Sequence, residues 1–149
     1  PACGPCLKRD MDVWTEFART KHISAASVSG DIDTRYRFVT QVVNTVKSVS
    51  LPKVAILGIT YNPGALDLTK SRGLAIASAL LSEDIDVKIY DPSGTWGGFS
   101  DILREYPVVD SLQAALETSN VVVKATDWPE FRNVDFGSRI VIDASGKKI

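Results

Sequence analysis

The sequence lacks any concentration of positive charge and any long apolar stretch. Its 17 lysines and arginines are spread along the chain and are balanced by 18 acidic residues, so the formal net charge is −1. We therefore expect no nucleic-acid partner and no attachment to an anionic membrane surface. No apolar run approaches the ~20 residues that span a bilayer, and no secretory signal peptide is visible. The expected location is the cytoplasm.

Histidine is nearly absent, and an initiator methionine is missing. His22 is the only histidine, and no cysteine, histidine or aspartate stands at ligand spacing from it. We expect His22 to lie at the surface and expect no metal site. The chain opens at Pro1 in the middle of a motif. We expect it to be a fragment whose N-terminal partner domain is absent.

One strand–helix–strand unit organises the chain. Residues 54–59, VAILGI, form an apolar run without polar alternation, which is typical of a parallel strand buried on both faces. After Ser71, apolar residues at 74–81 recur at helical spacing and predict an amphipathic helix. Residues 86–91, DVKIYD, form the next strand. Such a unit is nearly always a right-handed crossover.

The alternation continues to the C-terminus. Ser111 is expected to cap a helix, residues 121–125 and 139–143 are expected to form strands, and a short helix is expected around 100–105. With 44% hydrophobic residues, the chain is able to bury a real core. The predicted fold class is α/β, a Rossmann-like parallel sheet with flanking helices, preceded by a helical segment.

A parallel sheet of this kind binds its ligand outside the carboxyl ends of the strands. The residues expected to line that edge are Tyr61, Asn62, Thr126 and Ser145. Asp91 also ends a strand and is able to accept a ribose hydroxyl, but an aspartate before a proline is more often a turn former. The sequence thus predicts a ligand crevice at this edge.

The loop after the first strand lacks the glycine pattern of a dinucleotide cradle. That pattern needs three glycines, for the turn, for close approach of the pyrophosphate and for contact between helix and strand. Here Gly58 is followed by ITYNP before Gly64, and bulky Thr60 and Tyr61 stand where bare backbone is needed. We therefore expect a Rossmann-like domain that does not itself cradle NAD in the usual way.

Residues 11–50 are expected to be helical, with an interruption around residues 24–30. Asp31 is expected to cap the second helix. The apolar residues of that helix fall at 4-3-4-3 spacing and comprise Ile32, Tyr36, Val39, Val43 and Val46. This stripe packs either on the first helix or on a second subunit or missing domain.

Pro52 ends the helical part, because proline cannot continue a helix and restricts the residue before it. Two domains are therefore expected. Residues 1–51 form a helical segment, and residues 52–149 form the Rossmann-like domain.

Both cysteines lie in the sequence CGPC, residues 3–6. This spacing is found in thioredoxin-like redox proteins, where a strand precedes it. Here no strand precedes it, so that function is the least favoured. Cys6 is expected just ahead of the first helix, whose dipole favours the thiolate together with Lys8 and Arg9. Cys3 either forms a strained disulfide with Cys6 or points away and stays reduced.

Four segments in matching order resemble motifs of the UDP-glucose/GDP-mannose dehydrogenase family. Residues 54–73, VAILGITYNPGALDLTKSRG, look like the family's LGLAFKPxTDDxRESP stretch in its C-terminal UDP-binding domain. Residues 4–10, GPCLKRD, are similar to the catalytic GGxCxPKD, and residues 126–131, TDWPEF, to TxWxEF. Residues 143–146, DASG, stand where the family has DGRN. The collinear set is far more specific than any single match.

The resemblance implies a function for the longer protein. It implies the C-terminal portion of an NAD-dependent nucleotide-sugar dehydrogenase, similar to UDP-glucose 6-dehydrogenase. Such enzymes oxidise a sugar 6-hydroxyl to a carboxylate through a thiohemiacetal and a thioester on a cysteine, which splits a difficult oxidation into steps. The implied partners are a UDP-sugar substrate, an N-terminal NAD-binding domain and a second subunit in a homodimer.

The resemblance also implies roles for individual residues. Cys6 takes the place of the nucleophile, and Asp10 that of the carboxylate that positions or activates water. The implied substrate-binding residues are Gly4, Tyr61, Asn62 and Ser145. The implied cofactor-binding residues are Arg9, Thr69 and Lys70.

Three of these positions lack the cation that the family carries. Asn62 replaces a lysine, and Thr69 and Ser145 replace arginines. Each lost cation removes a charge-assisted hydrogen bond to phosphate or sugar, worth ~1.5–3 kcal/mol in a shielded site. The alternative function is therefore a non-catalytic nucleotide-binding or assembly module with the same fold.

Overall fold

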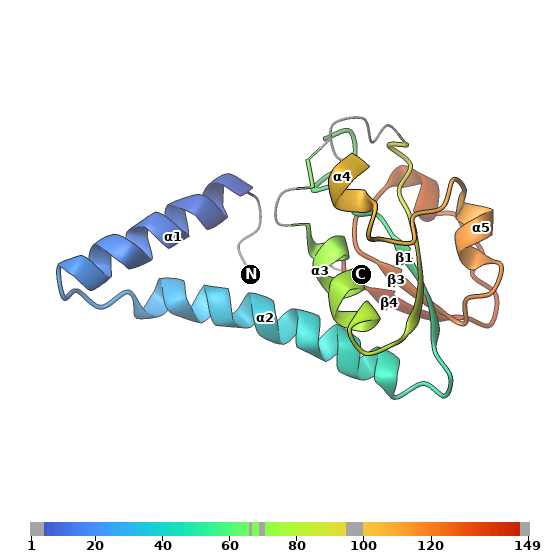
Figure 1. Ribbon diagram of the computed structural model, residues 1–149, viewed down its shortest axis with the longest axis horizontal. Helices are drawn as coiled ribbons and strands as arrows, with labels where there is room; N and C mark the ends of the chain where they lie inside the picture. The colour runs from blue at the N-terminus through green and yellow to red at the C-terminus, as the bar shows by residue number, and fades with distance from the viewer. Residues whose placement is uncertain (1–4, 66, 69–70, 95–99, 147–149) are drawn as a thin grey trace. The chain divides into compact units, whose positions relative to one another are not determined.

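The computed structural model describes residues 5–65, 67–68, 71–94 and 100–146 (Figure 1). The chain divides into two compact units, residues 1–41 and residues 42–149. The division falls inside the second helix, ahead of the sequence-based boundary at residues 51 and 52.

The first unit holds helix α1, Pro5–Thr20, and most of helix α2, Ala26–Lys47. Helix α1 begins at Pro5, ahead of residue 11, from which the chain is expected to be helical. Proline is tolerated at a first helical position, because the N–H that it lacks would have no partner in the helix there. His22, with a φ of 54°, lies in the turn after α1 and is exposed, as expected.

The expected interruption of the helical part is shorter than predicted. Helix α2 already begins at Ala26 and continues through Gly30, so Asp31 lies inside the helix and the prediction that it caps it is wrong. A glycine in a helix interior costs only ~1 kcal/mol, which a 22-residue helix tolerates. The predicted apolar stripe is also incomplete, because Val43 and Val46 are buried while Tyr36 is 70% exposed.

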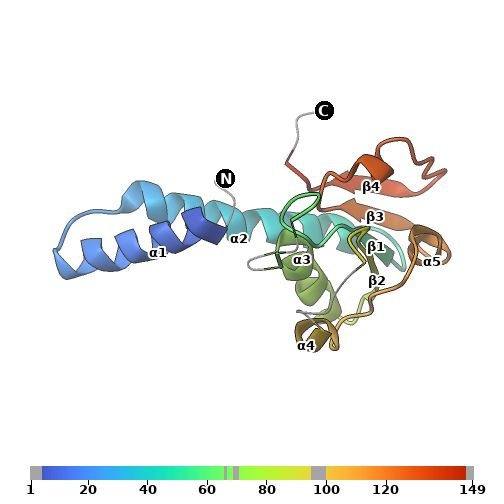
Figure 2. The ribbon, with the colours of Figure 1, turned by 90° about the horizontal axis from the view of Figure 1, so that it is seen from above.

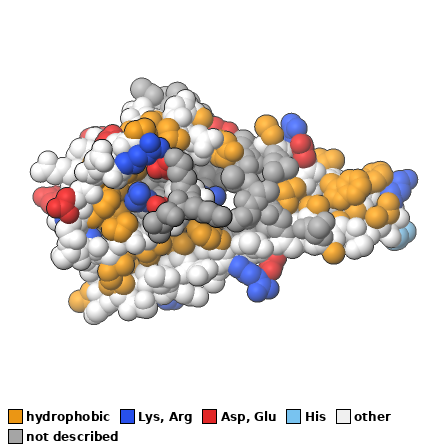
Figure 3. Space-filling model, turned by 180° about the vertical axis from the view of Figure 1, so that it is seen from behind, with side chains coloured by type: hydrophobic (Ala, Val, Ile, Leu, Met, Phe, Trp, Pro, Cys, Tyr) orange, Lys and Arg blue, Asp and Glu red, His pale blue; other side chains and the backbone are white. Residues whose placement is uncertain are grey.

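The surface of the first unit carries large apolar side chains. Val13, Trp14 and Phe17 of α1 are each at least 45% exposed, and the rings of Trp14 and Phe17 lie 5.7 Å apart. Figure 3 shows hydrophobic side chains gathered along this helical part, toward the end that carries the single histidine. Met11 and Ala18, on the same helix, are buried.

The second unit is built on a four-stranded parallel sheet of order β2-β1-β3-β4. Its strands are β1 Lys53–Leu57, β2 Asp86–Tyr90, β3 Val121–Lys124 and β4 Ile140–Asp143. The residues of β1 after Lys53 are buried on both faces, because both faces are covered. This sheet confirms the predicted α/β fold class with a parallel, Rossmann-like sheet.

Helices cover both faces of the sheet. Helix α3, Arg72–Leu81, and helix α5, Leu112–Leu116, lie on opposite sides of it (Figure 2). Both begin at the predicted serine caps, since Ser71 Oγ accepts from the Leu74 amide and Ser111 Oγ from the Ala114 amide, each at 3.1 Å. Two short helices, α4 (Ser100–Leu103) and η1 (Pro129–Phe131), complete the unit.

The strands end in register at one edge of the sheet. Leu57 pairs with Tyr90 on one side and with Lys124 on the other, and Lys124 pairs with Asp143. The loops that follow the four strands therefore leave the sheet side by side, at its carboxyl end.

Candidate functional site

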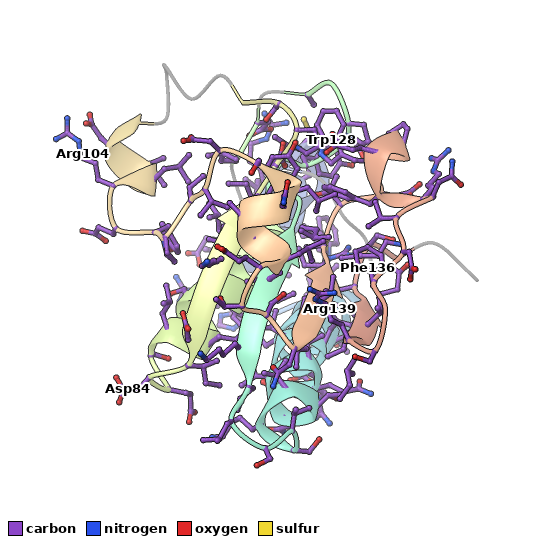
Figure 4. The ribbon with its side chains drawn as sticks, turned by 90° about the vertical axis from the view of Figure 1, so that its right-hand side faces the viewer. Asp84, Arg104, Trp128, Phe136 and Arg139 are labelled. Atoms are coloured by element: carbon purple, nitrogen blue, oxygen red, sulfur yellow. The ribbon has the colours of Figure 1, made fainter. Side chains whose placement is uncertain are left out.

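The carboxyl end of the sheet gathers the polar side chains that follow the strands. Thr60 follows β1, Asp91 follows β2, Thr126 follows β3 and Ser145 follows β4. The first three are buried, with exposed fractions of 3%, 3% and 6%. Figure 4 shows Trp128 at this end of the sheet and Asp84, which precedes β2, at the other end. This edge is the candidate functional site.

Asp91 is the centre of a hydrogen-bond network at this edge. Its Oδ2 accepts from the amides of Ile59 and Thr60, at 2.7 and 2.9 Å, and from the Thr60 hydroxyl at 3.0 Å. Trp128 Nε1 donates to the same oxygen at 3.3 Å. The other oxygen, Oδ1, accepts from the amide of Ser93 at 3.0 Å and from its hydroxyl at 2.6 Å. The carboxylate thus joins the ends of β1 and β2 to the segment after β3.

The network keeps Asp91 charged. Burial by itself raises the pKa of this carboxyl, but the hydrogen bonds from Ser93, Thr60 and Ile59 outweigh burial, so the pKa lies below its usual value. The bond from the Ser93 amide, two residues on, closes a turn and confirms Asp91 as a turn former. Both oxygens of Asp91 are thus engaged in hydrogen bonds within the chain.

Gly58 is required here for packing. Its φ is 90°, and a Cβ atom at this position would lie 2.5 Å from Cβ of Thr126. Thr126 Oγ1 in turn donates to the carbonyl of Thr60 at 2.6 Å. The amides of Ile59 and Thr60, next to this glycine, donate to Asp91. The backbone after β1 therefore does not fit the pyrophosphate of a dinucleotide, which needs such amides.

Tyr61 and Asn62 are presented by the loop that follows this anchored segment. The Tyr61 amide donates to the carbonyl of Asp67 and the Ala65 amide to that of Asn62, both at 3.0 Å. These bonds close the loop on itself. The Tyr61 side chain is 37% exposed and Asn62 is also exposed, so both are open to a ligand at the carboxyl end.

Ser145 lies at the same end but beyond β3, after the edge strand β4. Its amide and hydroxyl donate to Asp143 Oδ1 at 2.9 and 2.7 Å, and Lys124 Nζ lies 3.3 Å from Asp143 Oδ2. Burial raises the pKa of Asp143, but the bonds from Ser145 and Lys124 outweigh it and hold the pKa below its usual value. Arg72, the first residue of α3, donates to the carbonyl of Ala144. That bond ties α3 to the loop after β4.

Cys6, Arg9 and Asp10 share one face of α1, because they are three and four residues apart. Cys6 is an exposed free cysteine in the first turn of the helix, where the sequence pattern had placed it ahead of the helix. Arg9 Nη2 pairs with Asp10 Oδ1 at 2.8 Å, and this hydrogen bond is the main reason that the pKa of Arg9 is raised. All three belong to the first unit, whereas Tyr61 and Ser145 belong to the second.

Several predicted residues cannot be placed. Gly4, Thr69 and Lys70 lie outside the described residues, as does Cys3, so the predicted disulfide lies outside them too. Within the described ranges, no group of three histidine, cysteine, aspartate or glutamate residues is arranged to hold a metal ion. No helix among these same residues is both long and apolar enough to cross a bilayer.

Sequence reasoning missed the two contacts that hold this edge together. The bonds between Thr60 and Asp91 join residues 31 positions apart, and the bond from Arg72 to Ala144 joins residues 72 positions apart. The position of Asp91 at the end of a neighbouring strand was a usable signal for the first. Nothing in the local sequence indicates the second.

Known proteins with similar sequences are nucleotide-sugar dehydrogenases. The chain is 36% identical over 105 residues to the UDP-glucose 6-dehydrogenase AglM of Haloferax volcanii, covering 65% of this chain and 23% of that protein. It is 25% identical over 139 residues to the UDP-glucose 6-dehydrogenase of Rickettsia conorii, covering 89% of this chain and 32% of that protein. The chain therefore spans about a quarter to a third of these relatives.

Solved structures share the fold at lower identity. A UDP-glucose dehydrogenase from Pyrobaculum islandicum matches with a TM-score of 0.80 and 24% identity, over 95% of this chain and 34% of that one. A ternary complex of GDP-mannose dehydrogenase from Pseudomonas aeruginosa matches with a TM-score of 0.83 and 18% identity, over 96% of this chain and 36% of that one.

A family-level match covers most of the second unit. The sequence pattern of the UDP-glucose/GDP-mannose dehydrogenase family, UDP binding domain, matches residues 55–146. This range contains the sheet from the third residue of β1 onward, Asp91 and its donors, and the loops that carry Tyr61 and Ser145. The chain belongs to the UDP-glucose/GDP-mannose dehydrogenase family and contains its UDP-binding domain.

Proposed function

We propose that the chain is the C-terminal portion of an NAD-dependent nucleotide-sugar dehydrogenase that resembles UDP-glucose 6-dehydrogenase. The full protein oxidises the 6-hydroxyl of a UDP-sugar to a carboxylate. The observation that carries this proposal is the family match over residues 55–146, which contains the whole carboxyl edge of the sheet. Residues 52–149 serve as the UDP-binding domain, and residues 1–51 as the helical central region.

The UDP-sugar binds at the carboxyl end of the sheet. Tyr61 offers an exposed aromatic ring, and Asn62 and Ser145 offer hydrogen-bonding groups at the same edge. Arg72 and Lys124 bring positive charge to the side of the loop after β4, where phosphate oxygens would gain charge-assisted bonds. Gly4 is assigned to the substrate through the resemblance alone.

Cys6 is the proposed nucleophile of the second oxidation. Its thiolate adds to the aldehyde carbon of the oxidised sugar, and the aldehyde oxygen takes up a proton to give a thiohemiacetal. Loss of that hydroxyl proton, and of the carbon-bound hydrogen as a hydride, gives a thioester. Water then adds to the thioester carbonyl, the carbon–sulfur bond breaks, and the carboxylate and the thiolate are released. Asp10, one turn along the same face of α1, accepts the proton of that water.

NAD is the proposed acceptor of the hydrides, and the described part of the sheet does not fit it. The backbone amides after β1 donate to Asp91, and Gly58 is packed against Thr126. We therefore assign NAD to sequence outside this chain, in an N-terminal domain that corresponds to the remaining length of the relatives. Arg9, Thr69 and Lys70 are proposed to reach toward that cofactor.

The proposed assembly is a cytoplasmic homodimer. The exposed Val13, Trp14 and Phe17 of α1 form an apolar surface that gains from being covered. The cytoplasm supplies NAD and nucleotide sugars and keeps Cys6 reduced. The dimer is tested by measuring the molecular mass in solution of the parent and of a Trp14→Glu variant. If the dimer interface is formed by α1, the variant should be a monomer.

A non-catalytic nucleotide-binding or assembly module is the second candidate. It is favoured by Asn62, Thr69 and Ser145, which stand where the family has cations. A thioredoxin-like redox protein, the remaining alternative, is disfavoured by the parallel sheet and by the position of Cys6 on α1, with no strand before it among the described residues.

The deciding experiment is NADH formation by the full-length protein with a panel of UDP-sugars, next to its Cys6→Ala variant. We expect turnover with at least one sugar and its loss in the variant. Turnover that survives the change contradicts Cys6 chemistry, and absence of turnover with every sugar favours the module. The isolated 149-residue chain is expected to be inactive in either case.

A further inference from the structure

We infer that Asp91 is a positioning residue for the nucleotide site, because its buried carboxylate holds the segment from which Tyr61 and Asn62 project. The inference rests on the proposed function, in which those two residues contact the nucleotide. Asp91 does not touch the ligand itself. It affects the affinity of the site because it fixes the position of the residues that do.

Thr60 is fixed from two directions. Its amide and its hydroxyl both donate to Asp91 Oδ2, while its carbonyl accepts from Thr126 Oγ1 at 2.6 Å. The preceding amide, of Ile59, donates to the same carboxylate oxygen at 2.7 Å. All three donors precede Tyr61 directly in the chain, so the starting direction of the loop is set by the ends of β2 and β3.

The choice of a carboxylate is informative, because a buried charge is costly. Asp91 is 3% exposed, and no salt bridge to it is found among the described residues. Its charge is balanced by hydrogen-bond donors alone, including backbone amides and the indole of Trp128. Such a fully bonded buried group fixes a single geometry, which is what a preorganised binding site requires.

Asparagine is the sharpest replacement, because it preserves shape and removes one acceptor. Both oxygens of Asp91 accept hydrogen bonds, whereas asparagine has one accepting oxygen and an NH2 group that only donates. In Asp91→Asn the NH2 group must face either Ser93 or the amides of Ile59 and Thr60. The NH2 group facing Ser93 meets the Ser93 amide, and the NH2 group facing Ile59 and Thr60 meets both of their amides and releases the loop.

Asn120, the residue before β3, supplies a matched control because it holds the start of β1. Its side chain accepts from the Lys53 amide at 2.8 Å and donates to the carbonyl of Leu51 at 3.2 Å. Asn120→Ala therefore removes two bonds that hold the start of β1, just as changes at Asp91 remove bonds that hold its end. A purely structural role predicts similar consequences for the two changes.

The experiment uses the 149-residue chain with UDP as the probe. Calorimetric titration gives the Kd for UDP, and hydrogen exchange gives the protection of the Thr60 and Tyr61 amides. We expect Asp91→Asn to weaken UDP binding about tenfold or more and to speed exchange at both amides. Asn120→Ala should leave Kd within about twofold of the parent while lowering the unfolding midpoint.

Equal weakening in the two variants, or unchanged exchange in Asp91→Asn, overturns the inference. If Asp91→Asn does not fold, Thr60→Val removes a single donor to the carboxylate, and we expect about a threefold weaker Kd with faster exchange at Tyr61. A Thr60→Val variant with parental Kd and exchange would count against Asp91 equally. If the parent chain does not bind UDP, the proposed function fails, and the exchange data alone decide whether Asp91 positions the loop.

Discussion

The two ends of the sheet are built differently. The buried polar side chains among the described residues, Thr60, Ser71, Asp91 and Thr126, all lie at or near the carboxyl end. The amino end is held by Asn120, whose bonds to the backbone of residues 51 and 53 are exposed. Both ends connect the same strands, so the connections alone do not explain the difference.

The two ends of the sheet differ in whether their polar groups are buried or exposed to water. A buried polar group is costly unless each of its bonds is made, and an exposed one is satisfied by water. The carboxyl end carries the costly kind, together with Gly58 in a conformation that other residues avoid. That end is also the one where parallel sheets bind ligands. The buried polar side chains, with their hydrogen bonds made, are therefore concentrated where the proposed site lies.

Among these changes, Gly58→Ala should lower the free energy of unfolding most. A Cβ there would lie 2.5 Å from Thr126 Cβ, and the φ of 90° is strained for any other residue. We expect the free energy of unfolding to fall by about 3–5 kcal/mol, from strain and overpacking together. Urea unfolding of the chain measures this fall.

Gly64→Ala is the control for that change. Gly64 has a similar φ of 81°, but nothing lies within 4 Å of the Cβ position. Only backbone strain is added, and we expect a loss of about 1–2 kcal/mol. Equal losses at the two glycines would contradict the packing of Gly58 against Thr126.

Acid should unfold the carboxyl end through its aspartates. The pKa values of Asp91 and Asp143 are both lowered in the folded chain, from an ordinary value of 3.8. Their contribution is therefore present above about pH 4 and is lost as the pH falls through the folded values. We expect the unfolding midpoint in urea to drop as the pH falls below about 4.

The variant Asp91→Asn separates the contribution of Asp91 to this acid sensitivity from that of Asp143. It should be less stable than the parent at pH 7 and should lose less stability on acidification, so the two curves converge. Parallel curves for parent and variant would show that Asp91 is not charged in the folded chain.

A smaller effect is expected from Thr126→Val. The change removes the hydroxyl that donates to the carbonyl of Thr60 and keeps the shape of the side chain. We expect a loss of about 1–2 kcal/mol in the free energy of unfolding, because a buried carbonyl loses its partner. Thr126→Ser keeps the hydroxyl and should retain that bond. A valine variant as stable as the parent would contradict a contribution from this hydrogen bond.

The smallest effect concerns Tyr90, which ends β2. Burial, and then the hydrogen bond and charge of Glu130, raise its pKa to about 12. Stability linked to Tyr90 is therefore full below about pH 10 and is lost as the pH rises toward 12. Glu130→Gln should lower the titration midpoint of Tyr90, measured as tyrosinate absorbance against a Tyr90→Phe background. An unchanged midpoint would assign the whole shift to burial.

The sheet was predictable because its signals are local. The apolar run at residues 54–59 indicates a strand buried on both faces, and Ser71 and Ser111 mark helix starts by their own hydrogen-bonding chemistry. The parallel order of the strands follows from the alternation of strand and helix. The error in the second helix has a local cause too, since Gly30 belongs to the predicted interruption and lies within the helix.

The site was predictable only in part. The positions of Tyr61, Asn62 and Ser145 at the carboxyl end follow from strand boundaries alone. Asp91 was expected to form a turn, and it does, but its bonds to Ile59 and Thr60 depend on the register between β1 and β2. No pattern within a single segment of sequence encodes a contact that only sheet register creates.

Chemical-shift mapping of UDP on the 149-residue chain tests the central claim most directly. The account predicts saturable shifts at the carboxyl end, at the amides of Tyr61, Asn62 and Ser145, and none at Lys53 or Asn120 at the amino end. Shifts confined to the amino end would contradict it. So would the absence of shifts at UDP concentrations of a few millimolar, since a Kd in that range corresponds to a binding free energy of only about 4 kcal/mol.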